Sequence, residues 1–143
     1  MIDKILNTAR RLGACHLVSG ITRWRQLADL LFSPQGIEFC KHHNFPTLEM
    51  WREIAAVCPT KSLAIFIDAG DIIPQSHPNI ALVGDTRARL LYSSPETRNQ
   101  IIVAHGSQLD VTAEDYAVVT VSSIGSDNIV TTHTDSTALI YVD

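Results

Sequence analysis

The chain has 143 residues, of which 45% are hydrophobic and 18% are charged, and its formal net charge is −4 at pH 7. This size and composition indicate one or two small globular units and exclude a disordered chain. The negative charge argues against a protein that wraps nucleic acid without sequence preference, and no apolar run approaches the ~18 residues of a membrane span.

The composition changes near Pro59. Residues 1–60 carry seven Lys and Arg against five Asp and Glu, a net charge of +2, and they hold both tryptophans. Residues 61–143 carry four against ten, a net charge of −6, and they are rich in Val, Ile, Thr and Ser. We therefore expect an α+β protein with a helical cap subdomain over 1–60 and a β-rich domain over 61–143.

Helical periodicity predicts four short helices in the first part of the chain. The first begins near Ile2 and stops before Gly13, which suits the position after a helix end. Thr22, Ser33 and Thr47 are residues that favour N-cap positions, and each precedes a run of apolar residues at helical spacing. We expect the second, third and fourth helices to begin at these caps.

Alternation of apolar and polar residues predicts short strands in the second part. The predicted strands lie in eight runs: 63–68, 80–84, 88–92, 101–105, 109–113, 117–121, 129–133 and 138–142. Gly70 and Asp71 lie between the first two runs, and we expect them to form a turn.

The spacing of these runs indicates how the strands are arranged. Comparable apolar positions at Leu63, Ile80, Ile101, Val118 and Ala138 lie 17, 21, 17 and 20 residues apart. Such a repeat suits a short parallel β-solenoid, in which Ile80 lies beside Ile101 on parallel strands. An antiparallel β-sandwich or jelly roll is the alternative, because its hairpins also give alternating strands.

The ends of a solenoid expose apolar side chains and unpaired strand edges. We expect the helical part to cover the first coil. The last predicted strand stops at Tyr141-Val142-Asp143 with no helix after it. The exposed C-terminal coil is therefore a candidate surface for homo-oligomers.

Three residues are candidates for binding. Asp68 and Asp85 lie near glycines at predicted turns, where carboxylates from successive coils can come together, and His105 precedes Gly106 at the equivalent place one coil later. No acid, base and nucleophile set is recognisable, so we assign no catalytic residue. Neither a phosphate-binding glycine motif nor a calcium loop is present, and we expect no cofactor.

The cysteines indicate the compartment. Cys15, Cys40 and Cys58 are an odd number without CxxC spacing, which is typical of buried free thiols in a reducing cytosol. Cys40 and His43 share a helix face, but their spacing matches no common zinc module, and we expect no metal. The polar N-terminus lacks the apolar core of a signal peptide, so we expect a cytoplasmic protein.

The segment Ser33-Pro34-Gln35-Gly36-Ile37-Glu38-Phe39-Cys40 and the following Asn44-Phe45-Pro46-Thr47-Leu48 resemble a group of small uncharacterised proteins of gut bacteria and their mobile elements. The tail motifs around Gly84, His105-Gly106 and Tyr116-Ala117-Val118-Val119 extend the resemblance over residues 10–143. It implies a phage or mobile-element origin and a strand-rich repeat tail. The group has no assigned function, so no residue roles follow from it.

These observations favour a non-enzymatic binding or structural module that presents a solenoid face to a macromolecular partner, a protein rather than a carbohydrate. One alternative is a carbohydrate-active enzyme that uses Asp68, Asp85, Asp110 and His105, although aromatic residues make up only 6% of the chain. A second alternative is a DNA-binding regulator that uses Arg23 and Arg25. That hypothesis lacks a basic recognition helix, so nucleic acid is not the expected partner.

Overall fold

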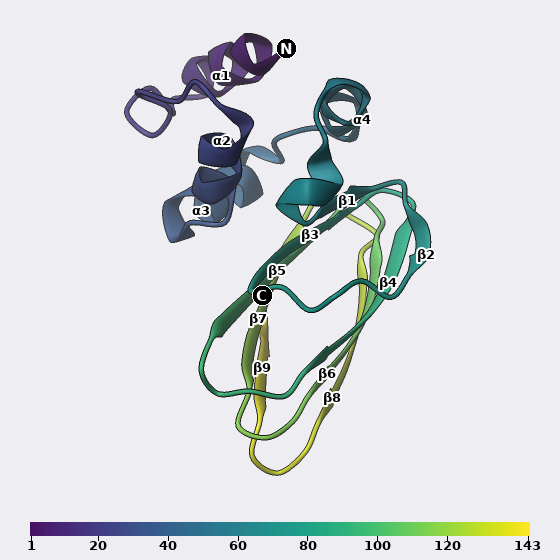
Figure 1. The fold of residues 1–143 in the computed structure, drawn as a ribbon. Helices are drawn as coiled ribbons and strands as arrows, with labels where there is room; N and C mark the ends of the chain where they lie inside the picture. The colour runs from purple at the N-terminus through teal and green to yellow at the C-terminus, as the bar shows by residue number, and fades with distance from the viewer.

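The computed structural model describes all 143 residues, with helices first and strands after them (Figure 1). The helices are α1 (Ile2–Arg11), α2 (Trp24–Leu31), α3 (Pro34–His43), α4 (Leu48–Val57) and the short 3-10 helix η1 (Thr60–Leu63). The four expected helices are confirmed, and no helix follows η1. None of the helices is long and apolar enough to cross a membrane.

Short polar side chains set where the helices begin. Ser33 and Thr47 cap α3 and α4 as predicted, each hydroxyl accepting the backbone N–H three residues further along, at 3.0 and 3.2 Å. The predicted cap at Thr22 is wrong by one residue, because Arg23 occupies that position. The Gln26 side chain decides this: its oxygen accepts the backbone N–H of Thr22 at 2.8 Å and of Arg23 at 3.0 Å.

The strands form two parallel sheets, which confirms the β-solenoid and excludes the antiparallel sandwich. The strands are β1 (Ile65–Ile67), β2 (Gly70–Ile72), β3 (Asn79–Val83), β4 (Thr86–Tyr92), β5 (Arg98–Ala104), β6 (Gln108–Ala113), β7 (Val118–Ile124), β8 (Ile129–Thr134) and β9 (Leu139–Val142). Sheet A has the order β1-β3-β5-β7-β9 and sheet B the order β2-β4-β6-β8, with every pairing parallel. The turn predicted at Gly70 and Asp71 is wrong, because these residues begin β2 and pair with β4.

The register of sheet A defines the coil. Ile80 lies beside Ile101 and Leu82 beside Val103, as predicted, and the column that starts at Ile80 continues through Val121 to Val142. The coils are therefore 21, 20 and 21 residues long by these register partners. Side chains from both sheets fill the interior, and those of Ile80, Leu82, Ile101 and Val103 are fully buried.

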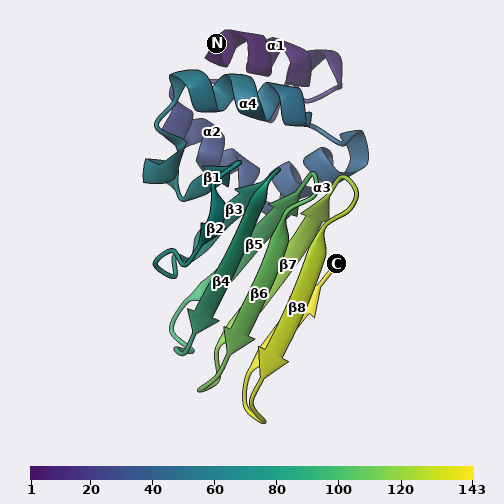
Figure 2. The same cartoon turned by 90° about the vertical axis from the view of Figure 1, so that its right-hand side faces the viewer.

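The helices pack on the outer face of sheet A. Alternate residues of β3, β5 and β7 point outward and join the helices in a second core: Ala81, Val83, Ile102, Ala104 and Ile124. All five are at most 1% exposed. The helical cap thus spans several coils, at one end of the strands (Figure 2). This corrects the expectation that it covers only the first coil.

One polar residue stands at the same corner of each coil, just before the sheet B strand or at its start. Thr86, Ser107 and Asn128 are in register with one another. Each side chain bonds to the backbone of the coil before it. The Thr86 hydroxyl accepts the N–H of Ala69 at 3.1 Å, the Ser107 hydroxyl donates to the Leu82 carbonyl at 3.0 Å, and the Asn128 amide donates to the Val103 carbonyl at 3.3 Å. These corner residues tie successive coils together.

Candidate functional site

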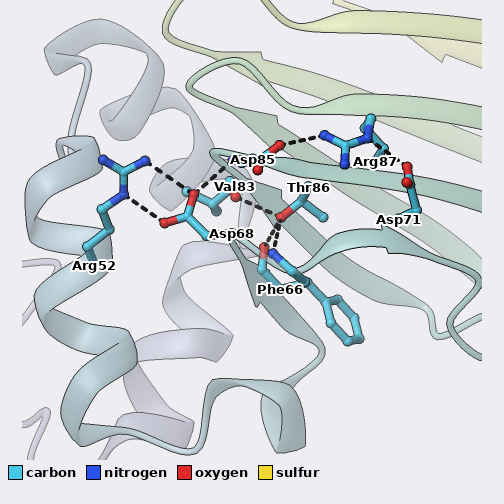
Figure 3. A network of polar contacts seen from close by, with 9 residues as sticks. Arg52, Phe66, Asp68, Asp71, Val83, Asp85, Thr86 and Arg87 are labelled. Atoms are coloured by element: carbon cyan, nitrogen blue, oxygen red, sulfur yellow. Dashed lines mark hydrogen bonds and ion pairs between the residues drawn. The ribbon is translucent and has the colours of Figure 1, made fainter.

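Asp68 and Asp85, two of the three candidate residues, lie together where α4 meets the first turns (Figure 3). The Arg52 guanidinium donates to both Asp68 oxygens, at 2.7 and 3.3 Å, and the backbone N–H of Asp85 donates to Asp68 at 2.9 Å. The hydrogen bond from Arg52 holds the pKa of Asp68 below its ordinary value. Asp68 therefore has a structural role, joining a helix to two coils.

Asp85 is engaged on its other side by Arg87. That guanidinium bridges Asp85 and Asp71, and its Nε lies 2.6 Å from the Asp71 carboxylate (Figure 3). The hydrogen bond from Arg87 lowers the pKa of Asp71. All three side chains are accessible to solvent, so this ion-pair network is screened and contributes little to stability. The network lies at the border between the turns and the outer surface of sheet B.

His105, the third candidate, does not join this network. Its backbone has a φ of 57°, and its Nε2 lies 2.8 Å from the Pro46 carbonyl. Because a carbonyl only accepts, Nε2 carries the proton in this contact. A side chain at Gly125 would strike the His105 ring, since an added Cβ there would lie 2.7 Å from Nδ1. His105 therefore anchors the loop between α3 and α4 to the turns.

The cysteines divide into two buried thiols and one exposed thiol. Cys40 and Cys58 are buried as expected, whereas Cys15 is exposed, which corrects the expectation of an inward-facing thiol. Burial raises the pKa of Cys40 to about 12, so this thiol is unreactive at neutral pH. His43 packs against the Phe39 ring, 4.5 Å away between centroids. No group of three or more His, Cys, Asp or Glu side chains could hold a metal ion.

The outer surface of sheet B is the broad face of the solenoid that no helix covers (Figure 2). We call it the sheet B face. Its side chains alternate with those that fill the interior, and they are Asp71, Arg87, Arg89, Leu91, Gln108, Asp110, Thr112, Ile129, Thr131 and His133. Parallel pairing brings side chains of four strands into rows across this face.

A shallow hollow of about 510 Å³ lies on the sheet B face. Both charge signs and exposed apolar side chains line it, including Arg89, Asp110, Ile73 and Ile129, of which the two isoleucines are 77% and 54% exposed. Asp110 pairs with His133 at 3.1 Å, and Arg87 pairs with Asp71 and Asp85. Arg89 has no ion pair, so its guanidinium is available to a ligand. The sequence analysis did not single out Arg89.

The tyrosines that could stack on sugars do not share the sheet B face. Tyr92 points into the solenoid, where its hydroxyl donates to the His77 carbonyl at 2.9 Å and burial raises its pKa. Tyr116 and Tyr141 are 66% and 56% exposed, but Tyr116 precedes β7 and Tyr141 lies in β9 of sheet A. The sheet B face therefore offers no aromatic platform.

The fold and this face define a class, a short parallel β-solenoid with N-terminal helices on one sheet. Comparisons of the chain with models of known families, with curated proteins and with solved structures found no match. The resemblance to the proteins of gut bacteria and mobile elements stays a prediction, and the function is inferred from the site alone.

Proposed function

We propose that this protein is a non-enzymatic binding module that presents the sheet B face to a protein partner. The proposal rests on one observation: helices pack against the outer face of sheet A, and none packs against the outer face of sheet B. Helices pack on the part of the outer face of sheet A that includes Ala81, Ile102 and Ile124, whereas no helix covers the sheet B face, which carries a hollow with an unpaired arginine. A rigid parallel sheet holds such side chains at fixed spacing, which favours recognition of a macromolecular surface.

The chemistry of the face favours a protein over other partners. Nucleic acid requires a basic surface, but Arg87 and Arg89 are balanced by Asp71 and Asp110 on the same face. Carbohydrate recognition commonly uses exposed Trp, Tyr or Phe rings, and this face has none of these residues. Exposed isoleucines around an unpaired guanidinium suit a peptide segment with an acidic side chain, because Arg recognises carboxylates through two parallel hydrogen bonds.

Selection from a random peptide display library tests this proposal. The wild-type protein serves as bait, and the selected peptides are then measured against Arg89→Glu and against a control, Arg25→Glu. Arg25 is exposed on α2, away from the face, so the two variants change the charge equally. We expect acidic peptides that bind the control normally and lose about tenfold or more in affinity for Arg89→Glu, which corresponds to roughly 1.4 kcal/mol.

Two results contradict the proposal. Peptides whose affinity does not change with Arg89→Glu would place binding elsewhere on the molecule. Hydrolysis of an oligosaccharide, lost in Asp110→Asn, would favour the carbohydrate-active alternative. That alternative requires Asp68, Asp85, Asp110 and His105 to act together, and each of them is already engaged in a separate contact.

We also propose that the C-terminal coil mediates self-association, with a second copy as the partner. β8 and β9 each pair on one side only, and β9 carries no charged residue that would protect its edge. Leu139 and Val142 are each 50% exposed there. Sedimentation of the wild type and of Leu139→Lys tests this: we expect a concentration-dependent oligomer that the substitution dissociates. A monomer at all concentrations would contradict it.

A further inference from the structure

His133 and Asp110 form an ion pair on the sheet B face, next to the arginine that the proposed function uses. The His133 Nε2 lies 3.1 Å from an Asp110 carboxylate oxygen, and both side chains are exposed to solvent. Asp110 is in register with Arg89 of β4. Because β6 lies between β4 and β8 in sheet B, the Asp110 carboxylate lies between the strands that carry Arg89 and His133.

Asp110 pairs with only one of these two basic neighbours. Arg89 forms no ion pair, although residues in register on neighbouring strands lie about 4.8 Å apart, within reach of an arginine side chain. The two neighbours differ in how they respond to pH. Histidine gains and loses its proton between about pH 5 and 8, whereas arginine stays charged. Asp110 is therefore paired with the neighbour whose charge depends on pH.

The other groups around His133 do not compete for its charge. Thr112 of β6 and Leu91 of β4 fill the rest of its row and are uncharged, and β9 has no charged residue. Glu114 and Asp135 lie beyond the ends of β6 and β8. The Asp135 carboxylate accepts three hydrogen bonds within the turn after β8. The Asp110 carboxylate is therefore the one charged group that pairs with the His133 ring.

We propose that the charge of His133 regulates the sheet B face, so that acidic peptides bind more tightly as the pH falls. This regulation rests on the proposed function, since it acts on the same arginine. Protonated His133 holds the Asp110 carboxylate and leaves Arg89 free for the peptide. When His133 loses its proton, Arg89 is the one cation left beside Asp110, and their pairing competes with the peptide. A positive His133 also attracts the carboxylate of the peptide directly.

Peptide affinities at about pH 5.5 and pH 8 test this regulation. The probes are the acidic peptides from the selection described above, whose carboxylates are ionised at both pH values. We expect the wild type to bind them about three- to tenfold more tightly at the lower pH, a modest change because solvent screens these exposed charges. His133→Gln cannot gain a charge and should bind equally at both. His16→Gln removes an exposed histidine between α1 and α2 and should keep the pH dependence.

A measurement without peptide separates this regulation from the proposed function. The ¹³Cζ resonance of Arg89 is followed over the same pH range. We expect it to change together with protonation of the His133 ring in the wild type, and to stay constant in His133→Gln and in Asp110→Asn.

The outcomes distinguish the two proposals. Binding that depends on Arg89 but is equal at both pH values overturns the regulation and leaves the proposed function standing. A pH dependence that persists in His133→Gln, or an Arg89 resonance that does not follow His133, also overturns the regulation alone. If no acidic peptide binds through Arg89 at either pH, the proposed function fails and the regulation fails with it.

Discussion

Substitution of Asn128 by alanine tests whether the corner residues hold the coils together. The Asn128 side chain makes four hydrogen bonds to backbone groups at one corner of the solenoid. Its oxygen accepts the backbone N–H groups of Gly106 and Ser107, at 3.0 and 3.2 Å, and its nitrogen donates to the carbonyls of Val103 and Ile124, at 3.3 and 3.1 Å. Asn128→Ala removes all four backbone bonds together, and with them a long contact of 3.5 Å from the Ser107 hydroxyl.

The two N–H groups determine most of the cost. Ser107 is fully buried, so its N–H cannot reach water once the acceptor is gone, and an orphaned buried donor costs about 1–3 kcal/mol. Gly106 is half-buried and recovers part of its hydration. The substitution also removes the hydrogen bonds that the Asn128 amide donates to the carbonyls of Val103 and Ile124. Together, we expect Asn128→Ala to lower the free energy of unfolding by about 2–4 kcal/mol. For a chain of this size, this is a decrease in Tm of roughly 10 °C.

Urea unfolding followed by circular dichroism measures this loss. Thr131→Ala is the matched control, because Thr131 points outward from β8 and makes no side-chain hydrogen bond. Exposed substitutions of this kind change stability by less than about 0.5 kcal/mol. If Asn128→Ala unfolds at the same urea concentration as this control, the corner hydrogen bonds do not stabilise the stack, and our reasoning about them is wrong.

The core and the turns allow three further predictions. Ile101→Asp places a charge at a fully buried position of the interior column, and we expect loss of the folded state by circular dichroism; a folded variant would contradict the register. Cys15 should react with a thiol reagent in the native protein while Cys40, with its pKa raised to about 12, reacts only after unfolding; equal rates would refute this. Hydrogen bonds from Thr137 lower the pKa of Asp135 from 3.8 to about 2, so its contribution to stability is present above pH 3.8 and is lost as the pH falls towards about 2. Urea unfolding should therefore show the wild type and Asp135→Asn converging over that range, and a constant difference would argue against the shift.

The solenoid was predictable because its signal is local and repeats. Alternation identifies which side chains share a face, and a spacing of 17 to 21 residues between comparable runs aligned Ile80 with Ile101 from the order of the residues alone. The same spacing aligned Val118 with Ile101, where the structure pairs Val121 with Ile101. β2 was missed for the converse reason. Its three residues begin with glycine, which predicts a turn, and pairing with β4 overrides that local preference.

The sequence could not show which faces are covered. Alternation assigns Ile102 and Arg89 to outward positions alike, yet Ile102 is buried under the helices and Arg89 is exposed. That difference depends on where the helical part docks, which is a long-range property. The candidates Asp68 and His105 were chosen for their residue type, and the structure gives both of them contacts with the helices or the loop that joins them.

The direction of the corner hydrogen bonds has a consequence for biosynthesis. Thr86, Ser107 and Asn128 each reach towards the coil made earlier in the chain. During translation, each new corner emerges from the ribosome when the backbone groups it needs have already been synthesised. The helices are made before all the strands, so every coil has a surface on which to form. Assembly can then advance vectorially, one coil at a time, without waiting for the rest of the chain.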